Sequence, residues 1–87
     1  MDKLVKRNYE INGKDYLENL VVEECAELID AMAKYKRGRL SINTVIEEMA
    51  DVQMTINNIL EIHNKKEFFD KCIEYKKSRL KEVLNIK

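Results

Sequence analysis

Residues 15–36, DYLENLVVEECAELIDAMAKYK, decide the fold. Apolar side chains recur in this stretch at intervals of three and four residues, which is the repeat of one face of an α-helix. They are Leu17, Leu20, Val21, Cys25, Leu28, Ile29 and Met32. Asp15, followed three residues later by Glu18, resembles a capping box and predicts the start of the helix, and Gly38 predicts its end. We therefore expect a long amphipathic helix over about 15–36.

Two further helices are expected downstream. Residues 43–63, NTVIEEMADVQMTINNILEIH, repeat the pattern after a Ser41 or Asn43 cap. Their apolar stripe consists of Val45, Met49, Val52, Ile56, Ile59 and Leu60. Asn64 predicts a break, and a third helix is expected over about 67–84. Its inner face, or the border of that face, carries Phe69, Ile73, Lys76, Leu80, Val83 and Leu84.

Residues 1–13 have mixed charge and end in an Asn12-Gly13 turn signal, so we expect them to be irregular. No linker or repeat divides the chain. The expected fold is all-α in a single domain over 1–87, in which an antiparallel helical hairpin is followed by a third helix.

Composition excludes several classes of protein. The 16 Lys and Arg residues balance 16 Asp and Glu residues, which argues against binding to a nucleic-acid polymer or an anionic membrane. No apolar run is long enough for a membrane span, and the first ten residues lack the apolar core of a signal peptide. Cys25 and Cys72 have no C-x-x-C spacing, which favours reduced thiols in a cytoplasmic protein, with a disulfide as the alternative.

Chain length bears on assembly. A domain of 87 residues buries only roughly 60–65% of its unfolded surface and is marginally stable alone. Met54 lies opposite the apolar stripe of its helix, which favours a subunit interface. We therefore expect oligomerisation that completes a four-helix-type bundle.

Acidic residues occupy positions where a purely structural helix would be apolar. With Leu17 at zero on a helical wheel, Glu24 lies at roughly −20°, inside the apolar arc, and Glu27 at roughly −80°, on its edge. With Val45 at zero, Glu48 lies at roughly −60°, and Asp51 is on the same flank about one turn further on. An ionised carboxylate buried without a partner is unfavourable, so Glu24 needs a cation or a proton.

Each helix thus presents two acids three residues apart, and an antiparallel hairpin brings the pairs together. Hard oxygen ligands suit Mg²⁺, with Mn²⁺ as a substitute. Surface charge or ordinary ion pairing is the alternative for either pair alone. A di-iron site requires Glu-x-x-His on two helices, whereas the single histidine, His63, has no acid at position 60.

The segment Glu23-Glu24-Cys25-Ala26-Glu27, followed after 20 residues by Glu48-Met49-Ala50-Asp51, is similar to the E-E-x-x-E … E-x-x-D pattern of the MazG-type all-α nucleoside triphosphate pyrophosphohydrolases. The likeness covers about 15–84. It implies cleavage of a nucleoside triphosphate, often a deoxynucleotide, between the α and β phosphates, which releases the monophosphate and pyrophosphate. It also implies a homodimer or homotetramer.

The resemblance also implies roles for individual residues. Those of Mg²⁺ ligands fall on Glu24, Glu27, Glu48 and Asp51, and that of a supporting or water-orienting carboxylate on Glu23. The family places a lysine and an arginine on the following helix to hold phosphate oxygens. Lys76 and Arg79 match these positions, and Lys77 is a substitute.

Two alternatives to the enzyme remain open. One is a catalytically silent helical module that binds nucleotides or a protein. The other is a coiled-coil adaptor, against which Glu24 counts because a coiled-coil seam is apolar.

Overall fold

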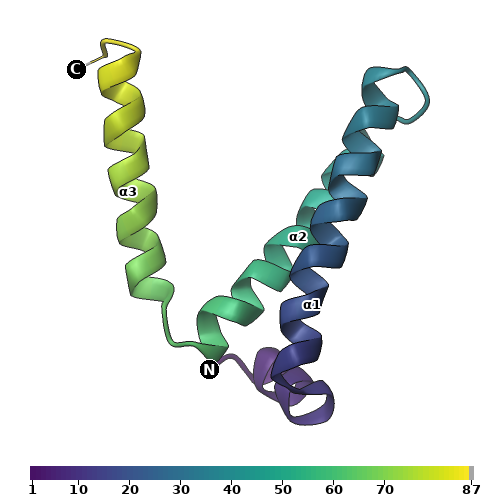
Figure 1. Ribbon diagram of the computed structural model, residues 1–87, viewed down its shortest axis with the longest axis vertical. Coiled ribbons are helices and arrows are strands. Elements are labelled where there is room, and N and C mark those ends of the chain that lie inside the picture. The colour runs from purple at the N-terminus through teal and green to yellow at the C-terminus, as the bar shows by residue number, and fades with distance from the viewer. Residues whose placement is uncertain (87) are drawn as a thin grey trace.

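The computed structural model describes residues 1–86 and confirms the all-α class. Its helices are α1 (Lys3–Lys36), α2 (Ile42–Ile62) and α3 (Lys66–Val83), and the described residues contain no strand (Figure 1). α1 reaches its expected end, and both ends of α2 and α3 lie within one residue of those expected. No described helix has the length and apolar content needed to cross a membrane.

The expectation of an irregular segment over residues 1–13 is wrong. Helical structure begins at Lys3, because the Asp2 carboxylate accepts hydrogen bonds from the backbone N–H groups of Leu4 and Val5, at 2.8 and 3.3 Å. Gly13 (φ 84°, ψ 170°) interrupts α1 and turns the N-terminal segment Lys3–Asn12 across the base of the hairpin (Figure 1). Gly13 thus divides α1 into two helices, and the second, which runs to Lys36, begins directly after it, close to the start expected at Asp15.

All three helices end in the same way, with a left-handed residue in a Schellman motif. Gly38 has φ 75°, Asn64 has φ 53° and Asn85 has φ 56°. The N–H of Arg39 donates to Lys34, that of Lys65 to Leu60 and that of Ile86 to Lys81, at 2.8–2.9 Å. The expected break at Asn64 is thus confirmed.

The core lies between α1 and α2, which pack side by side as an antiparallel hairpin (Figure 1). Leu17 and Val45 are fully buried there, with Ala31 nearly so. The edges of the expected stripes are open to solvent, since Ile29 is 71% and Met49 40% exposed. Cys25 and Cys72 are free and half-buried, so the described chain holds no disulfide between them.

The third helix stands apart from the hairpin. α3 meets α2 only weakly, contacts α1 nowhere in the described residues, and buries none of its own side chains (Figure 1). The radius of gyration is 16.0 Å, against about 12 Å for a compact domain of this length. Lys76, expected on or beside an inner face, is exposed in the single chain.

Candidate metal centre

Three carboxylates converge where α1 faces α2. Glu24 and Glu27 come from successive turns of α1, and Glu48 comes from α2. One oxygen from each lies within 4.8 Å of the others. Glu24 reaches this position because it shares the helix face of the buried residues Leu17 and Ala31, seven residues away on either side. The hairpin therefore brings together three of the four ligands that the resemblance implied.

Two of these carboxylates each hold an oxygen that has no partner. Oε2 of Glu24 and Oε2 of Glu48 are both buried, and neither accepts a hydrogen bond from any described group. Buried polar atoms in proteins nearly always have a partner, and leaving one without a partner is unfavourable. These two oxygens therefore lack the proton or cation that would offset the cost of their burial.

The pKa values of Glu24 and Glu48 also indicate that the cluster requires a proton or a cation. Burial, together with the neighbouring charge of Glu27, raises the pKa of Glu24 above its ordinary value, and the charges of Asp51 and Glu48 add to the effect. Burial and the charges of Glu27 and Asp51 likewise raise the pKa of Glu48. The cluster therefore either takes up a proton or binds a cation that offsets the repulsion.

The donor set fits a hard divalent cation. All three donors are carboxylates, with no histidine or cysteine among them. Oxygen-only donors suit Mg²⁺ and Mn²⁺, whereas zinc and iron–sulfur sites draw on nitrogen and sulfur. The three carboxylates could therefore hold such an ion, and the magnesium site stays a prediction.

The structure does not bring every residue of the expected site into the cluster. Asp51 is exposed and stands outside the set of mutually close donors, although its charge acts on both Glu24 and Glu48. Glu23 is exposed and is also outside the set.

The three basic residues expected to bind phosphate lie on α3, away from the hairpin. Lys76, Lys77 and Arg79 are all exposed. Lys77 Nζ lies 3.5 Å from an oxygen of Glu74, and the Arg79 guanidinium donates to the Tyr75 hydroxyl at 3.2 Å. Within one chain the expected phosphate-binding group is therefore separate from the carboxylates.

A cavity of about 400 Å³ opens beside the cluster, and sequence reasoning did not anticipate its lining. Glu27 and Glu48 lie on its wall, together with Thr44 and Lys34. Lys34 Nζ is 2.8 Å from an oxygen of Asp30, one turn earlier on α1. The place of Lys34 at the cavity depends on the packing angle of the hairpin, which periodicity does not encode.

Comparisons of the chain with protein-family models, with curated proteins and with solved structures find no match. The chemistry of the site therefore rests on its own residues.

Proposed function

We propose that this protein is a Mg²⁺-dependent nucleotide pyrophosphohydrolase of the MazG type, which hydrolyses nucleoside or deoxynucleoside triphosphates between the α and β phosphates. The observation that carries the proposal is the pair of buried, partnerless oxygens of Glu24 and Glu48 in a cluster of three carboxylates. A structural hairpin gains nothing from such oxygens, whereas a site for a metal and a phosphate needs them. The proposed setting is the cytoplasm, in control of the nucleotide pool or in removal of unwanted triphosphates.

Each member of the cluster has a role in this proposal. Glu24, Glu27 and Glu48 would hold Mg²⁺, and Asp51 would join them from the solvent side. The ion would supply positive charge for the phosphates, which the carboxylates alone would repel, and acidity for a bound water. Glu23 would orient the attacking water. One water is added across the α–β anhydride, and the monophosphate and pyrophosphate leave.

Phosphate binding would draw on two sources. Lys34 lines the cavity next to Glu27 and Glu48, so a phosphate there would compete with Asp30 for its ammonium group. Lys76 and Arg79 would reach a site only from a second copy of the chain or after α3 moves, with Lys77 as the substitute.

The surface of the chain supports a homo-oligomer. Its accessible area is 7131 Å², whereas a compact monomer of 10.3 kDa exposes about 5,400 Å². The excess is larger than the roughly 800 Å² that each partner buries in a standard interface. Exposed apolar side chains mark where this area lies: Ile42, Ile46, Met49 and Met54 on α2, and Phe68, Ile73, Leu80 and Val83 on α3. We propose that a second copy covers them, in a dimer or tetramer.

Product analysis tests the proposed function. The purified protein is incubated with each of the eight common NTPs and dNTPs, first with Mg²⁺ and then with EDTA. Metal-dependent release of monophosphate and pyrophosphate is expected. Release of diphosphate and orthophosphate would identify a different bond and refute the assignment.

A silent binding module is the second candidate, and the distance of the α3 basic residues from the cluster favours it. It predicts nucleotide binding without turnover of any of the eight substrates at high enzyme concentration. Turnover that Mg²⁺ supports and EDTA abolishes would exclude it.

A further inference from the structure

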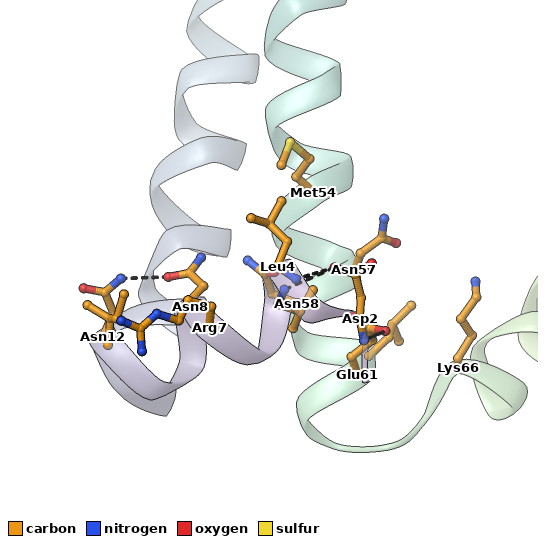
Figure 2. A pocket seen from close by; sticks show the side chains of 13 residues that line it. Asp2, Leu4, Arg7, Asn8, Asn12, Met54, Asn57, Asn58, Glu61 and Lys66 are labelled. Atoms are coloured by element: carbon orange, nitrogen blue, oxygen red, sulfur yellow. Dashed lines mark hydrogen bonds between the residues drawn. The ribbon is translucent and has the colours of Figure 1, made fainter.

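A second cavity, larger than the one beside the carboxylates, lies at the end of the hairpin opposite the α1–α2 loop. The two cavities share no lining residue. The volume of the larger cavity is about 670 Å³, within the range of small-molecule sites. It forms because Gly13 turns the segment Lys3–Asn12 back over the C-terminal half of α2 (Figure 2). Leu4, Val5, Ile11 and Leu60 give it apolar walls.

Four asparagines supply most of its uncharged polar groups. Asn8 and Asn12 belong to the N-terminal segment, and Asn57 and Asn58 belong to α2 (Figure 2). Nδ2 of Asn12 donates to Oδ1 of Asn8 at 2.7 Å, which leaves the Asn8 amide as a free donor and the Asn12 carbonyl as a free acceptor. These two groups could pair with a heterocycle whose edge carries an acceptor next to a donor.

Asn58 is the most deeply buried of the four asparagines. It is only 9% exposed, yet none of the side-chain hydrogen bonds around the cavity within residues 1–86 uses its amide. Asn57, by comparison, accepts from Gln53 at 3.2 Å. In the described part of the chain, the buried side-chain atoms that lack a partner are Oε2 of Glu24 and Oε2 of Glu48, and the Asn58 amide is not among them. Its polar atoms therefore border the open space of the cavity, where a ligand can reach them.

The charges at the cavity favour a neutral group. Asp2 and Glu61 balance Arg7 and Lys66, and the Glu61 carboxylate is already engaged by the backbone N–H of Asp2 at 2.9 Å. The cavity therefore does not select an anion such as a phosphate. An apolar chamber with several amides and no net charge suits an uncharged, flat, hydrogen-bonding ring.

The cavity and the carboxylates lie along the same helix, α2, at a separation that one nucleotide can cover. Met54, on its wall, follows Asp51 by three residues, or about one turn of α2. Asn58 lies ten residues after Glu48, a rise of about 15 Å along the helix. The chain of phosphates and the sugar of an extended nucleotide can cover such a separation.

We propose that this cavity binds the nucleobase of a nucleoside, which Asn58, Asn8 and Asn12 recognise by hydrogen bonds. The proposal rests on the proposed function for the identity of the ligand. It places base selection on the N-terminal segment and α2, and phosphate chemistry on the carboxylates.

The test separates binding of the base from catalysis. Full-length Glu24→Gln protein in EDTA is titrated with each of the common ribonucleosides and deoxyribonucleosides, which carry no phosphate. Binding is followed by the side-chain amide signals in ¹⁵N NMR spectra. We expect at least one nucleoside to shift the signals of Asn8, Asn12 and Asn58. Shifts confined to the neighbourhood of the carboxylates, or absent with every nucleoside, would overturn the proposal.

Variants sharpen the test. Asn58→Ala should weaken binding of the preferred nucleoside about tenfold, whereas Asn43→Ala, the same change at an exposed position of α2, should leave it unchanged. Equal affinities in these two variants would contradict the proposal. If Asn58→Ala does not fold, Ile11→Trp, which fills the cavity from a residue that is 63% exposed, should abolish nucleoside binding.

The two proposals fail in different ways. Turnover of a triphosphate with base preferences identical in the parent, Asn58→Ala and Ile11→Trp would uphold the pyrophosphohydrolase and overturn the base site. Nucleoside binding at the asparagines without turnover of any triphosphate would uphold the base site and overturn the enzyme. If Ile11→Trp changes the oligomeric state and no nucleoside binds the parent, the cavity belongs to a subunit interface, and the proposal is wrong.

Discussion

Replacement of Glu48 by Gln offers the most direct measurement of the candidate metal centre, because the neighbouring Glu47 provides a matched control. Both residues are glutamates on α2, but Glu47 is exposed and lies outside the set of mutually close donors. Glutamine keeps the shape of the side chain and removes its charge. Glu48→Gln should therefore weaken Mg²⁺ binding, while Glu47→Gln should not.

Thermal unfolding gives the size of the effect. At a Mg²⁺ concentration of 100 times Kd, a site present only in the folded state adds about 2.7 kcal/mol to the free energy of unfolding. For a domain of this size that corresponds to a rise in Tm of about 10–20 °C. If loss of one of three carboxylates weakens binding about 100-fold, the same Mg²⁺ concentration stabilises Glu48→Gln by only about 0.4 kcal/mol, or about 2–3 °C.

The assay is differential scanning fluorimetry or calorimetry at pH 7, with and without Mg²⁺, at one fixed protomer concentration. Circular dichroism in EDTA checks that all three proteins are helical. A Tm response to Mg²⁺ in Glu48→Gln equal to that of the parent would refute the site. Loss of the response in Glu47→Gln would show that general surface charge, not the cluster, attracts the ion.

Four further predictions follow from other features. Because the folded-state pKa of Glu24 is raised, the metal-free protein should lose stability as pH rises above the ordinary carboxyl range, and Glu24→Gln should flatten this dependence in denaturant titrations from pH 4 to 8. Glu24→Gln should also abolish turnover; equal product release by parent and variant would contradict the assignment. Leu17→Ala should cost about 3–5 kcal/mol in urea unfolding, while Ile29→Ala, at a 71% exposed position, should change stability by less than about 0.5 kcal/mol. Ile46→Glu should shift sedimentation towards the monomer if α2 forms the subunit interface; unchanged sedimentation would place the interface elsewhere.

The hairpin could be predicted because its signals are local. The spacing of apolar residues around Leu17 and Val45 determines which faces of the two helices are buried, and the short connection at Gly38 makes them antiparallel. Once the faces were known, the position of Glu24 inside the stripe followed from helical geometry alone. The meeting of Glu24 with Glu48 was therefore foreseeable from the sequence.

Other features depend on interactions that periodicity does not contain. The helix over Lys3–Asn12 was missed, although its signal was present in Asp2, a good N-cap directly before the first helical residues. The large cavity was not foreseeable, because it results from the direction that the chain takes at Gly13. The exposure of Lys76 has another cause: its helix has an apolar stripe, but no element within residues 1–86 covers it.

The left-handed turn at Asn64 is the point at which the direction of α3 relative to the hairpin is determined. With little packing to restrain it, α3 takes its direction from the torsion angles of Asn64 and Lys65. A helix of 18 residues is about 27 Å long, so a rotation of about 10° at this pivot moves its far end by about 5 Å. A small change in two backbone angles thus changes the position of the charged groups of Lys76 and Arg79. Exchange of α3 between neighbouring copies would require no unfolding of the hairpin.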